Sequence, residues 1–349
     1  MSDVINAEML HLFCEELRLC KVGAGQTIAV LTGGTVRADY AQCFMHAALE
    51  LGATAYQVNI PAPTSALPAA SIGKTQLAAH RHAVDALKNA DMVIDLLGLL
   101  FSAEQNEIMA AGVRILYVAE PLHVIRKMFP TQDLRSRVEF AGALLRQAKE
   151  LHVTSSAGTD LRYKLGNYPT MTEYGYTDEP GRWDHLPSGF VFTHGDDDGV
   201  DGQVVLMPGD AIAALRHYLQ SRVILTVEKG HVTRIEGDGM DAALISDYIR
   251  SFHDPRAYAV SHIGWGLNEN AHWFHMVETR DLDRERAMNS LAFYGNVLFS
   301  TGPNTELGGT NDTACHLDLP LRKSNLSLDG TPVVQDGELV IPEMQAPGR

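Results

Sequence analysis

The sequence is poor in cysteine, and this shortage excludes two classes of protein. Only four of the 349 residues are cysteine, at positions 14, 20, 43 and 315, and their spacing matches no zinc-binding pattern. Four thiols are also too few for a disulfide framework, so a reducing cytoplasm is the expected location. Cys315 neighbours a candidate metal ligand, but a buried structural thiol is the preferred interpretation.

Long apolar runs and basic residues are also scarce. No run reaches the roughly 18 apolar residues of a transmembrane helix, and the first eight residues lack the basic and apolar stretches of a signal peptide. The 28 basic residues are outnumbered by 43 acidic ones, which gives a formal net charge of -15. This balance argues against nucleic acid or an anionic membrane as a partner. The content of 45% hydrophobic and 20% charged residues is typical of a globular protein.

Apolar patterning predicts two domains with a boundary near residue 155. Residues 1–155 alternate between short apolar runs and stretches with helical periodicity, which predicts an α/β domain with a parallel sheet. One long helix is expected over residues 131–151. Residues 156–349 are richer in short strand-like runs, so we expect a β-rich α+β domain. Within it, residues 224–235 are typical of a hairpin with Gly230 in the turn.

His316 and Asp318 form the most informative pair in the chain. They lie two residues apart in the alternating apolar run Cys315-His316-Leu317-Asp318-Leu319. In a β-strand such residues point to the same face, roughly 7 Å apart at Cα. The pair is therefore a candidate for binding one metal ion, although a strand-end histidine followed by a capping aspartate has the same pattern.

His262 is the second candidate histidine, in a glycine-rich segment, Ser261-His262-Ile263-Gly264-Trp265-Gly266. Two histidines and one carboxylate form the facial triad of non-haem Fe(II) oxygenases. A buried histidine of the core is the alternative for His262 alone.

Segments of the C-terminal half resemble the two-domain metalloaminopeptidases of the aminopeptidase T family. The matching segments, in the family's order, are residues 158–161, 187–193, 262–266 and 316–318. This resemblance implies an aminopeptidase T-like fold. However, Phe190 and His262 stand where the family carries metal-binding glutamates, and Leu298 stands where it carries a histidine. The ligands that remain suit one metal ion rather than two.

The chain as a whole is more similar to the 2,5-dihydroxypyridine 5,6-dioxygenases, ring-cleaving enzymes of nicotinate degradation. The most specific stretches are residues 172–176, 178–185, 261–267, 299–306 and 315–318. The resemblance implies Fe(II) held by His262, His316 and Asp318, with Glu173 and His185 lining the substrate pocket. It also implies a homo-oligomer. One departure is Phe101, where relatives carry a histidine.

The expected reaction is extradiol-type opening of 2,5-dihydroxypyridine by O₂, between C5 and C6, to N-formylmaleamate. Glu173 or His185 would accept a proton from the substrate, although a surface carboxylate and an exposed loop histidine are the alternatives for these two residues. A metalloaminopeptidase with Zn or Co is the alternative enzyme, and a binding protein without catalysis is the alternative outside enzymes. Three further residues are candidates for supporting the ligands or for structural roles: Asp160, Arg182 and Glu306.

Overall fold

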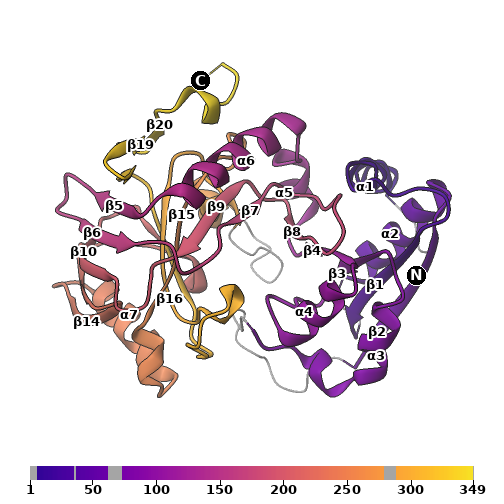
Figure 1. Cartoon of the computed structure of the whole chain (residues 1–349), viewed down its shortest axis with the longest axis horizontal. Coiled ribbons are helices and arrows are strands. Elements are labelled where there is room, and N and C mark those ends of the chain that lie inside the picture. The colour runs from indigo at the N-terminus through magenta and orange to yellow at the C-terminus, as the bar shows by residue number, and fades with distance from the viewer. Residues whose placement is uncertain (1–5, 35–36, 62–72, 279–287, 349) are drawn as a thin grey trace. The chain divides into compact units, whose positions relative to one another are not determined.

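The computed structural model describes residues 6–34, 37–61, 73–278 and 288–348, which divide into two compact units (Figure 1). Unit 1 consists of Met1–Pro130 and Tyr174–Ser188, and unit 2 consists of Thr131–Glu173 and Gly189–Arg349. The chain therefore leaves unit 1, returns to it once, and ends in unit 2. The predicted boundary near residue 155 falls inside unit 2.

Unit 1 is built on a parallel sheet, as predicted. Its strand order is β2-β1-β3-β4-β8, and every neighbouring pair is parallel. Every residue of β3 and β4 is buried, as expected for a sheet covered on both faces. The strands are β1 (Thr27–Gly33), β2 (Thr54–Ile60), β3 (Met92–Asp95), β4 (Arg114–Val118) and β8 (Trp183–Leu186).

Helices cover both faces of this sheet. In Figure 1, α1 and α2 lie on one side of the sheet, and α3 and α4 lie on the other. This is the arrangement that right-handed crossovers between parallel strands produce when the strand order reverses after β2. The helices of unit 1 are α1 (Ala7–Leu19), α2 (Ala38–Glu50), η1 (Gln76–Ala79), α3 (Arg81–Leu87), α4 (Ala103–Ala110) and α5 (Leu122–Lys127).

Unit 2 contains an eight-stranded sheet whose neighbouring pairs are all antiparallel. The order is β14-β13-β10-β6-β5-β18-β19-β20. The predicted hairpin is confirmed, with Lys229 and Gly230 both at positive φ in its turn. The strands are β5 (Glu150–Thr154), β6 (Asp160–Lys164), β10 (Val200–Leu206), β13 (Val223–Glu228), β14 (His231–Glu236), β18 (Asn325–Leu328), β19 (Thr331–Gln335) and β20 (Glu338–Leu339).

The helix expected over residues 131–151 was predicted too long. Helix α6 spans Gln132–Gln147, and Ala148 is already extended. From Glu150 onward the chain pairs with both β6 and β18 in the eight-stranded sheet. Tertiary pairing therefore overrides the helical pattern of the last residues.

A second antiparallel sheet of unit 2 carries the residues of interest. Its order is β17-β16-β15-β9-β7. Helix α6 packs on β7 and β9, and its buried Arg137 donates a hydrogen bond to the Leu267 carbonyl just after β15. The strands are β7 (Met171–Glu173), β9 (Phe190–His194), β15 (Val260–Gly266), β16 (Val297–Thr301) and β17 (Leu317–Leu321).

Short elements complete unit 2. They are the strand pair β11 (Ala211–Ile212) and β12 (His217–Tyr218), and the helices η2 (Ala213–Leu215), α7 (Met240–Ser251), η3 (Pro255–Tyr258), α8 (His275–Glu278), α9 (Met288–Leu291), η4 (Thr305–Leu307) and η5 (Pro342–Met344).

Two expectations can be compared with the structure, one drawn from the small number of cysteines and one from the lack of long apolar runs. Each of the four cysteines is buried and free, and this includes Cys315. Among the described residues, no helix combines the length and the apolar character needed to span a bilayer.

Candidate metal centre

Histidine and carboxylate side chains gather on one face of the sheet formed by β17, β16, β15, β9 and β7. His194 on β9 lies directly opposite His262 on β15, and Ser300 on β16 lies opposite Asp318 on β17. Residues paired in this way share a face of the sheet. Two strand spacings, roughly 10 Å, separate β15 from β17, and the small side chain of Ser300 lies between them. The longer side chains of His262 and Asp318 can therefore meet above β16.

His262, His316 and Asp318 converge closely, as their spacing in the sequence predicted. The Nε2 atoms of His262 and His316 lie 3.0 and 3.1 Å from the same oxygen, Asp318 Oδ1. The two imidazole rings are 5.0 Å apart, centroid to centroid. Their nitrogen and oxygen atoms form a group with the composition and spacing of a metal site.

The bonding of Asp318 Oδ1 tests whether a cation fits this group. The atom is buried, and among the described residues it has no hydrogen-bond partner, although two imidazole nitrogens lie nearby. Buried polar atoms are rarely left without a partner. Three atoms that can each bind a metal, the two Nε2 atoms and Asp318 Oδ1, thus face one another without hydrogen-bonding. This arrangement is suited to bind one cation between them. Two imidazoles and one carboxylate match the donor set of mononuclear non-haem iron.

Glu306 and His194 extend the cluster on the far side of His262. Glu306 Oε1 lies 2.8 Å from His194 Nε2 and 3.8 Å from His262 Nδ1. The Glu306 side chain is only 1% exposed and that of His194 only 2%. His262 is therefore placed between two carboxylates, Asp318 at its Nε2 atom and Glu306 at its Nδ1 atom.

The electrostatics of the metal-free cluster favour two ionised carboxylates. Burial alone would raise the pKa of Glu306, but His194 and His262 lower it to about 2. Burial likewise opposes ionisation of Asp318, yet His316 and His262 hold its pKa well below the usual range. Burial lowers the pKa of His262, but the Asp318 and Glu306 carboxylates outweigh burial and raise it to about 9. A metal ion must displace the proton from His262, so metal affinity should fall as the pH falls.

Hydrogen bonds to the backbone fix the strands that carry the ligands. Tyr248 on α7 donates its hydroxyl to the His316 carbonyl, at 3.1 Å. Ser300 donates its hydroxyl to the His262 carbonyl at 2.8 Å, and Ser261 donates to the Pro303 carbonyl at 2.5 Å. The candidate ligands are thus held by strand pairing and by three side-chain hydrogen bonds, which limits the movement of their backbone.

Gly302 allows the backbone to approach His316 closely. It has φ +134°, and a Cβ atom there would lie 2.5 Å from the Cys315 carbonyl oxygen and 3.1 Å from His316 Nδ1. We expect Gly302→Ala to displace His316 and to weaken metal binding by at least about 10-fold, as supporting changes around metal ligands commonly do. Gly308→Ala is the control, because Gly308 has φ +91° but open space around it. Equal Co(II) dissociation constants for the two variants would contradict this role of Gly302.

The two predicted catalytic residues are both buried, but they lie in different units. Glu173 ends β7 in unit 2, opposite Phe190 and therefore on the face that carries His194 and His262. His185 lies on β8 of unit 1, with its ring 4.6 Å from that of Tyr117. Their exposed fractions are 3% and 6%. A surface carboxylate and an exposed loop histidine were therefore the wrong alternatives for these positions.

The three supporting candidates have different environments. Glu306 lies in the cluster, as described above. The Asp160 side chain is 66% exposed and pairs with His152 on the eight-stranded sheet, so a supporting role at the metal was the wrong interpretation. Arg182 belongs to unit 1, where it pairs with Asp184 at 2.6 Å and lies over the Tyr174 ring.

His194 is a site residue that the sequence did not reveal. It ends the run Phe190-Val191-Phe192-Thr193-His194, in which every residue is buried. The pairing of β9 with β15 brings it to His262. The only signal available was a histidine at the end of an apolar strand.

Aromatic side chains stand beside the cluster, and one of them, Phe190, is the residue that the aminopeptidase T resemblance aligns with a metal-binding glutamate. Phe190 and Phe192 stack with 5.1 Å between centroids, and the Phe192 ring is 5.0 Å from that of His262. Two stacked aromatic rings therefore lie next to the candidate ligand His262.

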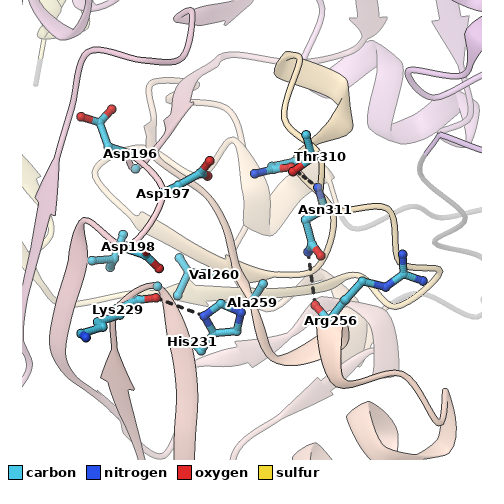
Figure 2. A pocket seen from close by; sticks show the side chains of 14 residues that line it. Asp196, Asp197, Asp198, Lys229, His231, Arg256, Ala259, Val260, Thr310 and Asn311 are labelled. Atoms are coloured by element: carbon cyan, nitrogen blue, oxygen red, sulfur yellow. Dashed lines mark hydrogen bonds between the residues drawn. The ribbon is translucent and has the colours of Figure 1, made fainter.

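A separate cavity in unit 2, of about 330 Å³, has a different character (Figure 2). Figure 2 shows a hydrogen bond between the His231 ring and the Lys229 carbonyl, and another from the Asn311 side chain to the Arg256 carbonyl. None of the five cluster residues lines it. Its charged walls are not those of a site for an aromatic ring. They include residues 196–198, all aspartate, with Lys229, His231 and Arg256.

Comparisons with known proteins identify one family over nearly the whole chain. A family model described as 2,5-dihydroxypyridine 5,6-dioxygenase matches residues 8–341. A protein of that name from Pseudomonas putida strain KT2440 is 45% identical over 345 residues, which are 97% of this chain and 98% of the relative. The solved structure of the 2,5-dihydroxypyridine dioxygenase from that strain aligns with a TM-score of 0.93 at 43% identity, over 99% of both chains.

A second solved structure is similar in fold alone. AmpT from Thermus thermophilus aligns with a TM-score of 0.62 at 14% identity, over 95% of this chain and 99% of AmpT. The predicted aminopeptidase T-like architecture, a parallel α/β sheet with further antiparallel sheets, is thereby confirmed.

Proposed function

The chain belongs to the 2,5-dihydroxypyridine 5,6-dioxygenase family, and from this membership we propose that it uses Fe(II) and O₂ to open 2,5-dihydroxypyridine between C5 and C6, forming N-formylmaleamate. The observation that carries the proposal is the convergence of His262, His316 and Asp318 around a buried carboxylate oxygen, for which the described part of the chain offers no hydrogen-bond partner.

Charge balance supports a single divalent ion. The cluster contains two carboxylates, Asp318 and Glu306, and three histidines. With the histidines neutral, one divalent cation brings the net charge of this buried group to zero, and buried charge without compensation is costly. Bound Fe(II) would supply the redox chemistry that lets O₂ react with an aromatic ring.

The apolar face beside His262 suits a heteroaromatic substrate. Phe192 packs against the His262 ring, and Phe190 stacks on Phe192. Aromatic rings favour offset stacked or edge-to-face contacts with one another. We propose that these phenylalanines hold the pyridine ring beside the metal ligands and exclude water from that side.

Proton transfer is assigned to Glu173 and His185. Loss of a hydroxyl proton makes the dihydroxypyridine ring more electron-rich, and that proton needs an acceptor. Histidine is suited to this role near neutral pH, and burial raises the basicity of a carboxylate. We propose that a carboxylate oxygen of Glu173 or a ring nitrogen of His185 accepts it.

Nothing specific favours the aminopeptidase alternative. The fold similarity to AmpT is at 14% identity. Phe190 and His262 replace the two glutamates that a dinuclear site of that kind would need. We therefore propose the dioxygenase reaction alone.

The test is reconstitution of the metal-free protein with Fe(II) in the absence of air, followed by addition of 2,5-dihydroxypyridine and then air. We expect one equivalent of O₂ to be consumed per substrate, loss of the substrate's ultraviolet absorbance, and N-formylmaleamate by mass spectrometry. A zinc-loaded sample is the control for iron dependence. Absence of O₂ uptake, together with hydrolysis of a peptide p-nitroanilide, would reject the proposal.

Two further properties are proposed with the function. The family resemblance suggests a homo-oligomer, and the four free thiols suit a reducing cytoplasm. Analytical ultracentrifugation of the purified chain measures the oligomeric state directly.

A further inference from the structure

Glu306 occupies a buried position with no role so far in the proposed reaction. Its carboxylate lies between two imidazoles, that of His194 at 2.8 Å and that of His262 at 3.8 Å. Its second oxygen, Oε2, is buried and has no hydrogen-bond partner in the part of the chain that the structure describes. A buried carboxylate is costly unless nearby groups compensate its charge. The burial of the Glu306 charge therefore indicates that nearby groups compensate it.

The two nitrogens of His262 face different groups. Its Nε2 atom faces Asp318, on the side where the metal would bind, and its Nδ1 atom faces Glu306. A neutral imidazole that ligates through Nε2 carries its proton on Nδ1. That buried Nδ1 has no hydrogen-bond partner within the described residues, and the Glu306 carboxylate is the acceptor beside it.

His194 fixes the carboxylate from the opposite side. Its Nε2 hydrogen-bonds to Glu306 Oε1 at 2.8 Å. Because His194 pairs directly with His262 across β9 and β15, the strand register sets the distance between the two rings. The rings lie 6.1 Å apart at an interplanar angle of 81°.

We propose that Glu306 is a positioning residue for the proposed metal ligand His262, accepting a hydrogen bond from its Nδ1–H group when metal is bound at Nε2, and that His194 holds Glu306 in place for this role. The inference rests on the proposed function only in requiring a metal at His262. Partners of this kind fix the tautomer and ring orientation of a ligating histidine and make it a stronger donor.

A second metal ion is the competing explanation, because His194, His262 and Glu306 could themselves hold a cation. Two divalent ions would leave the five-residue cluster with a net charge of +2 when its histidines are neutral. One ion gives zero. Charge balance therefore favours the positioning role.

The test compares Glu306→Gln and His194→Gln with the wild-type full-length chain. Co(II) is the probe, with its dissociation constant measured by competition with a chelator and its ligand geometry followed by the visible d–d spectrum. We expect Glu306→Gln to weaken Co(II) binding about 10- to 100-fold and to shift the spectrum, with a smaller effect for His194→Gln. Wild-type protein should bind one equivalent.

Control variants separate this role from a general effect of the substitutions. Glu338→Gln, on the exposed side of β20, and His231→Gln, on β14, should bind Co(II) as the wild type does. Glu306→Asp keeps the charge at a shorter reach, and its affinity should fall between those of the wild type and Glu306→Gln. It also serves if the glutamine variant does not fold.

Two results would overturn the inference. One is an unchanged dissociation constant and spectrum in a folded Glu306 variant. The other is binding of two equivalents by the wild type, with the second equivalent lost in both variants. Neither readout requires ring cleavage, so failure here and failure of the proposed function are distinguishable.

Discussion

Replacing His316 or Asp318 with alanine is expected to abolish metal binding and ring cleavage together while the protein remains folded. Each substitution leaves two of three ligand side chains. Loss of a supporting residue around a metal typically costs 10- to 100-fold in affinity or activity, so loss of a direct ligand should cost more than about 100-fold. Asp318 is the more sensitive position because both imidazoles converge on its Oδ1 atom.

The measurement is iron content by atomic emission, paired with O₂ uptake on 2,5-dihydroxypyridine. Circular dichroism reports whether each variant is folded. His231→Ala is a matched control, since His231 lines the separate charged cavity and makes no contact with the ligand cluster that the structure records. One full equivalent of iron retained in His316→Ala would show that His316 is not a ligand.

The second large effect is a loss of turnover expected on substitution of Glu173 or His185. Here, unlike in the His316 and Asp318 variants, iron binding should be retained. Glu173→Gln and His185→Gln preserve shape but cannot accept a proton in the same way. General acid–base groups typically contribute about 10²- to 10⁴-fold to the rate. We therefore expect kcat to fall by that order in at least one variant, while iron binding stays at one equivalent.

Steady-state O₂ uptake across pH, with iron content on the same samples, makes this measurement. The base is the residue whose substitution removes the acidic limb of the pH–rate profile. A normal kcat and an unchanged profile in both variants would exclude proton transfer by either residue. Loss of iron in either variant would point instead to a structural or ligating role.

The parallel sheet was predictable because its first four strands are short strand-like runs separated by helical stretches. Its fifth strand was not. Residues 183–186 read Trp-Asp-His-Leu, without apolar continuity, and they join the sheet only by pairing with β4. The end of α6 was mistaken for a similar reason, since pairing with β6 and β18 determines the conformation from Glu150 onward.

At the site, the spacing of residues along one strand predicted the pair of His316 and Asp318. The place of His194 depends instead on the pairing of β9 with β15. His316 and Asp318 were visible because two residues of a strand separate them. His194 was not, because Phe190 to Thr193 before it are those of an ordinary buried strand. Its meaning depends on lying opposite His262, a relation that no local pattern encodes. Glu306 was recognised as a candidate, but its place between two histidines was not.

The positions of the ligands along the chain also bear on when the enzyme becomes active after synthesis. His262 belongs to β15, while His316 and Asp318 arrive with β17, the last strand added at its edge of the sheet. The proposed iron site is therefore incomplete in a nascent chain until β17 has left the ribosome and paired with β16. A metal that binds only the paired strands stabilises them by mass action. Iron loading would thus follow completion of the chain, and truncated or stalled products would remain without metal and without reactivity toward O₂.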